Sequence, residues 1–198
     1  MQFKMTSGFS IVELLVTVSL ASVILAFGVP GFQSMTRDSR LTSESSRLVT
    51  AFNLARSEAI KRGQQVTLCK ADPNAIPPIC NTNACDATSG ANCWEQGWLV
   101  FADANGNGIL NDGTDTDSCP QKDCTIRVFE GLPEGLTLRT SNISRWLAFQ
   151  SPGTARSSNG LANDTFRLCQ GVDSAHARSI VLNTIGRARV DQGTAACP

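Results

Sequence analysis

A single carboxylate, Glu13, lies inside a long apolar stretch near the N-terminus, and no other charged side chain occurs in residues 9–29. An unpaired carboxylate in lipid is costly and tends to take up a proton, and a charge inside a membrane generally has a partner and a purpose. An amine from a neighbouring chain would neutralise the Glu13 carboxylate, but only if the two helices lie in one axial register. Alternatively, a carboxylate this close to the end of the stretch reaches the membrane surface.

Two arginines near the C-terminus, Arg187 and Arg189, are spaced for contact with phosphates. In a strand they project to the same face about 7 Å apart, which matches successive phosphates along a nucleic-acid strand. This spacing would suit a clamp on the DNA backbone, although a short basic motif is weak evidence for one. The alternative is an ordinary solvated strand face on which an arginine pairs with Asp191 or Asp173. The arginines that would widen the clamp are Arg178, Arg167 and Arg156.

The run Asp103-x-Asn105-x-Asn107-Gly108 matches the start of a calcium-binding loop. An EF-hand would place a bidentate glutamate at the twelfth position, where this chain has Thr114. Asn-Gly pairs favour a hairpin turn between two strands, and we prefer that interpretation. The acids that could still complete a weak calcium site are Asp112, Asp115 and Asp117.

Eight cysteines in a chain of 198 residues indicate an oxidising compartment. No C-x-x-C pair is present, so a zinc site built from such pairs is not indicated. Sequence alone leaves many pairings open, although local spacing suggests a particular set. The suggested pairs are Cys80–Cys85, Cys119–Cys124, Cys69–Cys93 and Cys169–Cys197.

The sequence carries no arrangement typical of an enzyme. The only histidine, His176, lies between two alanines and is expected on the surface or in a loop. We find no serine-histidine-acid arrangement, phosphate-binding loop or clustered metal ligands, and we expect no cofactor. The 17 basic and 17 acidic residues cancel, but residues 72–124 are acidic and residues 125–198 are basic.

The elements that position these residues begin with the apolar stretch. As a helix, residues 9–29 would be about 30 Å long, the thickness of a bilayer core. A secretory signal peptide ends at a small-residue cleavage site, whereas Pro30 and Gly31 follow this stretch and a new helical pattern begins. We therefore expect a membrane-spanning helix with a kink or local melting point at Pro30 and Gly31.

The helical pattern continues beyond the apolar stretch with apolar residues at steps of three and four, as on one face of an amphipathic helix. Gly63 then suits a C-terminal cap. We expect one helix from about Phe9 to Arg62, with its second half packed on the rest of the chain. The residues of this face are Leu41, Ser45, Leu48, Phe52, Ala55 and Ala59.

Beyond Gly63 the apolar residues alternate with a period of two, in short runs separated by turn residues. The sequence therefore predicts a mainly antiparallel β region packed against the helix, an α+β architecture. The predicted strands are Gln65–Cys69, Trp98–Ala102, Ile126–Glu130, Leu136–Arg139, Trp146–Gln150, Phe166–Cys169, Ser179–Asn183 and Arg187–Val190.

The segment Gly8-Phe9-Ser10-Ile11-Val12-Glu13-Leu14 resembles the processing motif of type IV pilins and type II secretion pseudopilins. The resemblance implies that a prepilin peptidase cuts between Gly8 and Phe9 and methylates the new N-terminus at Phe9. It also implies that Glu13 serves filament assembly. Many type IV pilins have a helix-kinking proline where this chain has Pro30.

The segments Gln96–Asp103, Asn105–Gly108, Ile126–Val128, Ser179–Asn183 and Gly186–Arg189 resemble the FimT/GspH group of minor pilins and pseudopilins. This implies the type IV pilin fold, a long N-terminal helix packed on an antiparallel β-sheet head. It also implies a low-abundance filament component that helps initiate assembly or lies near the tip, without settling which filament system it belongs to, and we favour a type IV pilus. The Gly-Arg-x-Arg element is associated in this group with DNA binding in natural transformation. A minor pseudopilin of a type II secretion system is the alternative.

The resemblance predicts four parts of the chain: a leader (1–8), a transmembrane and filament-core helix (9–29), its amphipathic continuation (30–63) and a β-rich head (64–198). The implied partners are other minor and major pilins, the inner-membrane assembly machinery, prepilin peptidase and the membrane, with double-stranded DNA as a candidate. The implied location is the inner membrane, as a single-pass protein, and after assembly a periplasm-spanning or extracellular pilus.

Overall fold

The computed structural model describes residues 9–72, 75, 79–80, 92–111, 122–160, 162–193 and 196–197. It divides into two units, Met1–Ser39 and Arg40–Pro198, which are described separately below as the N-terminal unit and the head. The elements are α1 (Ile11–Arg62), β1 (Val66–Lys70), β2 (Trp98–Ala102), β3 (Cys124–Phe129), β4 (Leu136–Arg139), β5 (Trp146–Phe149), β6 (Ala155–Ser157), β7 (Asp164–Gln170), β8 (Asp173–Leu182) and β9 (Ala188–Gln192).

Helix α1 continues through residues 28–31 without a break, so the melting point predicted at Pro30 and Gly31 is not observed. A proline removes one helical hydrogen bond, and the helix continues past this position although Gly28 and Gly31 nearby are poor helix formers. At its other end α1 terminates as predicted. Gly63 has a φ of +67° and donates its backbone N–H to the carbonyl oxygen of Ala59 at 3.0 Å, the left-handed glycine cap common at helix C-termini.

The part of α1 that belongs to the head buries one face in the core. Because a helix repeats every 3.6 residues, side chains at steps of three and four share a face. The aromatic ring of Phe52 on this face lies 6.5 Å from the ring of Phe149 in β5 and 5.3 Å from that of Phe166 in β7. The predicted face is confirmed in full, since Leu41, Ser45, Leu48, Phe52, Ala55 and Ala59 are all buried.

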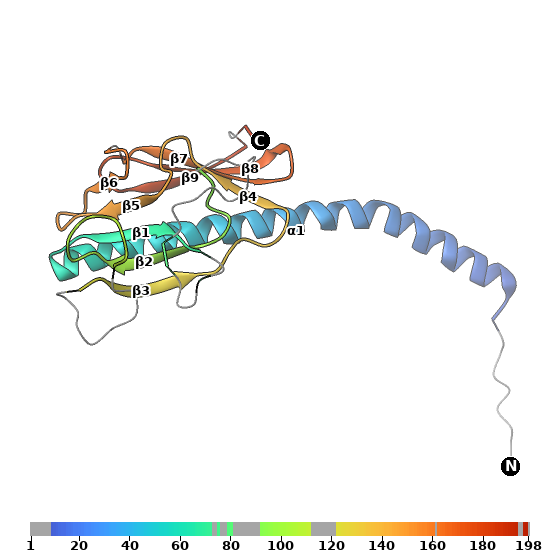
Figure 1. The fold of residues 1–198 in the computed structure, drawn as a ribbon. Coiled ribbons are helices and arrows are strands. Elements are labelled where there is room, and N and C mark those ends of the chain that lie inside the picture. The colour runs from blue at the N-terminus through green and yellow to red at the C-terminus, as the bar shows by residue number, and fades with distance from the viewer. Residues whose placement is uncertain are drawn as a thin grey trace, which may run out of the picture. The chain divides into compact units, whose positions relative to one another are not determined.

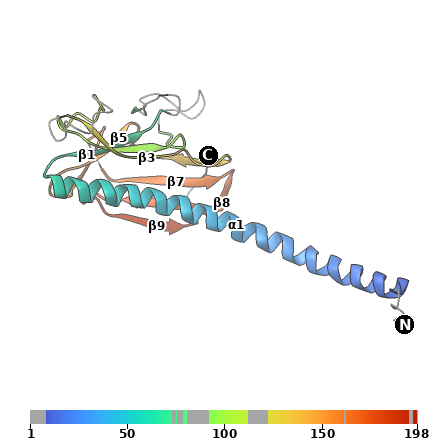
Figure 2. The same ribbon diagram turned by 90° about the horizontal axis from the view of Figure 1, so that it is seen from below.

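Within the described residues the strands form two antiparallel sheets, in the orders β3-β2-β1-β5-β6 and β4-β7-β8-β9. Figures 1 and 2 show the head part of α1 running along both sheets. Apolar residues of both sheets meet this helix in one core cluster. The predicted α+β architecture, with a helix packed on antiparallel sheet, is confirmed.

The eight predicted strands are all present; β2 and β4 match their predicted ends, and the others have shifted ends. β3 begins two residues before the predicted start, and β8 begins at Asp173 rather than at Ser179. The first half of β8 carries small and polar residues without a period-two pattern, which is why its start was missed. β6 was not predicted, because Ala155–Ser157 is too short for a periodic signal.

Candidate functional site

The N-terminal unit exposes its apolar side chains along the described part of its helix. Among the described residues, α1 is long and apolar enough to cross a membrane, and an 18-residue window of it has a mean hydropathy of 2.3. The hydroxyl groups of Thr17, Ser19 and Ser22 each donate to a backbone carbonyl oxygen three residues earlier. Polar groups satisfied within the helix suit a segment surrounded by lipid, so this unit is compatible with a membrane anchor.

Glu13 lies in the first turn of α1, with an exposed side chain. The free backbone N–H groups of a first turn favour a nearby negative charge. Phe9 precedes the helix and is 75 % exposed, whereas Gly8 lies outside the described residues. The structure thus places Phe9 and Glu13 at an accessible helix start, and their roles in processing and assembly stay predictions.

Arg178 is buried in the head, so it does not extend the DNA clamp as predicted. Its side chain is 6 % exposed. The guanidinium donates to the carbonyl oxygen of His176 at 2.8 Å and to Thr42 Oγ1 of α1 at 3.4 Å. Arg178 alternates with the buried residues Ile180 and Leu182 in β8. It therefore shares the core-facing side of the sheet.

Arg187 and Arg189 are both exposed, but their surroundings differ. β9 begins one residue after Arg187, whose backbone N–H donates to Asn183 Oδ1 at 2.8 Å. Arg189 lies in β9, and its Nε donates to Asp191 Oδ2 at 3.1 Å. The ion pair that the sequence left as an alternative is therefore present at Arg189. Across the described residues, the guanidinium of Arg187 makes no hydrogen bond or ion pair.

The Asp103 carboxylate organises the loop that follows β2. It is buried and accepts hydrogen bonds from the backbone N–H groups of Asn107 (3.2 Å) and Gly108 (2.8 Å) and from Thr67 Oγ1 (2.8 Å). The side-chain oxygens of Asn105 and Asn107 each accept the backbone N–H two residues ahead.

Residues 103–108 therefore form a turn held by side-chain oxygens, but the next strand described, β3, begins at Cys124, so this turn is not the tight hairpin between two strands that was predicted. In the part of the chain that the structure describes, no three His, Cys, Asp or Glu side chains are grouped to hold a metal ion. The remaining calcium candidates, Asp112, Asp115 and Asp117, lie outside the described residues.

Cys69 of β1 forms a disulfide with Cys80. This pairing replaces two that local spacing suggested, Cys80 with Cys85 and Cys69 with Cys93. The reason lies in the backbone, because Ala71 and Cys80 form an antiparallel bridge that holds Cys80 beside the end of β1. The chain turns back on β1 at this point, which sequence separation does not reveal.

The second disulfide, Cys169–Cys197, is the pair that the spacing suggested. It joins β7 to a residue 28 positions later, near the C-terminus, and so ties the tail to the sheet. Cys93 and Cys124 are also disulfide-bonded. Cys85 and Cys119 lie outside the described residues.

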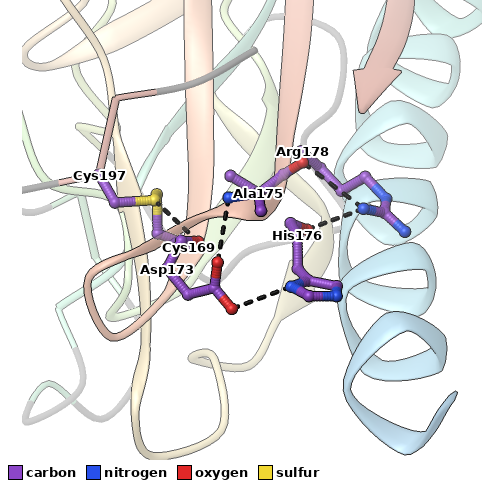
Figure 3. Close-up of a disulfide and its surroundings, with 7 residues drawn as sticks. Cys169, Asp173, Ala175, His176, Arg178 and Cys197 are labelled. Atoms are coloured by element: carbon purple, nitrogen blue, oxygen red, sulfur yellow. Dashed lines mark hydrogen bonds and ion pairs between the residues drawn. A yellow bond between two sulfur atoms is a disulfide. The ribbon is translucent and has the colours of Figure 1, made fainter. Parts of the chain in front are cut away.

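Figure 3 shows how the start of β8 is fixed beside this disulfide. The Asp173 carboxylate accepts the backbone N–H of Ala175 at 3.0 Å and lies 2.9 Å from His176 Nδ1. Cys197 Sγ lies 3.6 Å from the carbonyl oxygen of Asp173. His176 is therefore a half-buried residue of β8 paired with an acid; of the two predicted positions, the surface or a loop, the loop is not observed. Its contacts hold the turn between β7 and β8.

Sequence reasoning missed two buried charges in the head. Lys70 in β1 is 2 % exposed; burial, followed by the charge of Arg145, lowers its pKa, while Glu95 raises the pKa. Asp164 accepts three consecutive backbone N–H groups in the loop between β4 and β5. Single charges inside short strands leave no periodic signal, so neither was predictable.

The model of the protein family described as "Type II transport protein GspH" matches residues 44–186, well over half of the chain. A search of curated proteins finds no match. Among solved structures, two crystal forms of the type IV minor pilin FimU of Pseudomonas aeruginosa (strain PAO1) are similar, each at 19% sequence identity.

One FimU structure has a TM-score of 0.50, covering 79% of this chain and 97% of that chain. The other has a TM-score of 0.53, covering 82% and 96%. At this identity the likeness concerns the fold alone. It confirms the type IV pilin fold that the sequence resemblance implied.

Proposed function

We propose, from the premise that the chain belongs to the GspH family, that it serves as a minor pilin of a type IV pilus. One combination of observations supports this function. The family match and the pilin fold of the head occur in a chain whose N-terminal helix exposes apolar side chains suited to lipid or to a filament core. Members of this family are structural proteins rather than enzymes.

The proposed maturation is a cut between Gly8 and Phe9 with methylation of Phe9, followed by insertion guided by Glu13. The parts would then be the leader (1–8), the filament-core helix (9–29), its continuation (30–63) and the head (64–198). Mass spectrometry of the mature chain should find Phe9 first, carrying one methyl group. In a filament preparation, Glu13→Gln should be depleted at least several-fold while Glu58→Gln is retained. Equal amounts of both variants would contradict the assembly role of Glu13.

The pilus function and its alternative, a minor pseudopilin of a type II secretion system, differ in what fails when the gene is deleted. We expect fewer surface pili, with secreted enzymes unchanged, because a subunit that helps initiate assembly near the tip limits how many filaments start. Intact piliation with lost secretion would instead establish the pseudopilin function. Electron microscopy of cells and assays of culture supernatants give the two readouts.

The pilus subunit is further proposed to bind double-stranded DNA through Arg187 and Arg189. The support is the exposure of both side chains and the lack of an ion pair at Arg187 across the described residues. Binding should be indifferent to sequence and weakened by salt, because it displaces counterions from phosphates. Arg187→Ala/Arg189→Ala in the full chain should lose most DNA binding in a gel shift. Arg127→Ala/Arg145→Ala, which removes two other exposed arginines, is the matched control.

A further inference from the structure

Two glycines bring three segments of the head together at the C-terminal end of α1. Gly153, in the turn between β5 and β6, has a φ of +81°, and Gly186, in the turn between β8 and β9, has a φ of +74°. A Cβ atom on Gly186 would lie 2.8 Å from the carbonyl oxygen of Gly153 and 2.9 Å from the Phe149 ring. The glycine of the Gly-Arg-x-Arg element is thus required for packing, and it fixes where Arg187 begins.

Arg56 of α1 lies on the other side of the same contact. A Cβ atom on Gly153 would come within 3.0 Å of Arg56 Nε and 3.1 Å of Ile60 Cδ1. The Arg56 side chain therefore lies against the Gly153 backbone, which in turn contacts Gly186, the neighbour of Arg187. Residues 56 and 187, which are far apart in the sequence, flank one junction of backbone.

Both guanidinium groups are available for a ligand. Arg56 is half-buried and Arg187 exposed. In the described part of the chain neither guanidinium has a hydrogen bond or an ion pair. The one acid close by on α1, Glu58, already binds both neighbouring cations, Arg62 at 2.7 Å and Lys61 at 3.7 Å. Along the last turns of α1, positive side chains therefore outnumber negative ones.

Two planar guanidinium groups with little acid around them suit phosphate oxygens, which accept paired N–H donors. We propose that Arg56 and Arg187 form one site for the phosphate backbone of double-stranded DNA, at the junction of α1 with the turns at Gly153 and Gly186. The inference rests on the proposed DNA-binding function. It moves the centre of the site from the face of β9 to this junction, since Arg189 is paired with Asp191.

The test measures the affinity of the full chain in detergent micelles for a fluorescent DNA duplex over a salt series. Arg56→Gln should weaken binding several-fold and reduce the slope of log K against log salt by about one, because one phosphate contact is lost. Arg56→Lys should recover part of the affinity, since it restores the charge but not the planar guanidinium with its paired N–H donors. Arg145→Gln removes an exposed arginine at the far end of β5 and should bind like the unmodified protein.

The outcomes separate this inference from the function on which it rests. If the unmodified protein binds DNA and Arg187→Gln weakens it, but Arg56→Gln matches Arg145→Gln, the junction site is refuted while DNA binding stands. If the unmodified protein does not bind the duplex at any salt, the DNA-binding function fails. An Arg56→Gln variant with normal DNA affinity but poor incorporation into filaments would also refute the site, and would show that Arg56 contacts a neighbouring subunit. Unchanged circular dichroism and thermal midpoints exclude misfolding.

Discussion

The two parts of α1 differ in whether their apolar side chains are exposed or buried. In the N-terminal unit Phe27 is 80 % exposed, whereas in the head Phe52 is 1 % exposed. Both phenylalanines belong to one unbroken helix, so backbone conformation does not distinguish them. The distribution of apolar residues around the helix distinguishes the two parts. The first part is apolar on every side, which suits lipid or the core of a filament, and the second confines its apolar residues to one face. We therefore expect the first part to find its partners in lipid or in neighbouring subunits.

The largest effect expected from this contrast is on the stability of the head. Phe52→Ala should lower its free energy of unfolding by about 3–5 kcal/mol, because it leaves a cavity among the rings of Phe149 and Phe166. Phe27→Ala, in the exposed part, should change it by less than about 0.5 kcal/mol. Chemical denaturation of the full chain in detergent, followed by tryptophan fluorescence, compares the two. Similar losses of stability in Phe52→Ala and Phe27→Ala would contradict the contrast between the two parts of α1.

Adding volume should give a smaller effect of the same kind. Ala55 is fully buried on the packed face, so Ala55→Leu has no room and should cost about 1–3 kcal/mol of head stability. Ala21 is exposed in the first part of α1, and Ala21→Leu should leave head stability unchanged. The thermal midpoints of the two variants provide the measurement. A neutral Ala55→Leu would mean that the helix can move away from the sheets.

The packed face of α1 could be predicted because periodicity reports burial directly. Steps of three and four identified six of the seven residues that the structure buries from Leu41 to Ala59, and only Ala51 was missed. The same holds for strands with clear alternation, such as β2 and β4, whose predicted ends match the observed ones. β6 and the first half of β8 were missed because three residues, or a run of small polar ones, carry too little pattern.

The candidate site was less predictable, because it depends on contacts between distant segments. The sequence identified Arg187 and Arg189 as a pair, yet whether Arg178 faces solvent or core depends on the position of α1, whose Thr42 meets its guanidinium. The juxtaposition of Arg56 with the turn before Arg187 also required the fold. Likewise, Cys69–Cys80 follows from a backbone bridge that has no sequence signal.

Lys70, in the interior of the head, is a charge that the contrast between buried and exposed apolar residues does not anticipate. Lys70 is buried, and burial is the main cause that lowers its pKa below the ordinary 10.5. Lys70→Met keeps a similar volume and avoids the desolvation of this charge, which costs stability at neutral pH.

This advantage should shrink as the pH rises towards 10.5. Between its lowered pKa and 10.5, Lys70 binds more protons in the unfolded chain than in the head, so the unmodified protein gains stability with pH in that window. Denaturation curves at several pH values measure the difference. Lys61→Met, at a lysine whose side chain is 76 % exposed, should show no such trend. A pH-independent difference between Lys70→Met and the unmodified protein would mean that Lys70 is solvated.

The smallest effect concerns two of the glutamates of α1, Glu13 in its first part and Glu58 in the head. Arg62 donates a hydrogen bond to Glu58 that lowers its pKa below the ordinary 4.5; the charges of Arg62 and Lys61 add to this, and burial opposes it. Because the folded pKa is depressed, the stability from this pair is present above about pH 4.5 and is lost as the pH falls through the lowered pKa. Glu58→Gln should therefore cost about 0.5 kcal/mol at neutral pH and nothing in strong acid.

Glu13→Gln should leave head stability unchanged at both pH values, because the contacts we propose for Glu13 lie in another subunit. A loss of head stability in Glu13→Gln would show instead that the first part of α1 has partners within its own chain.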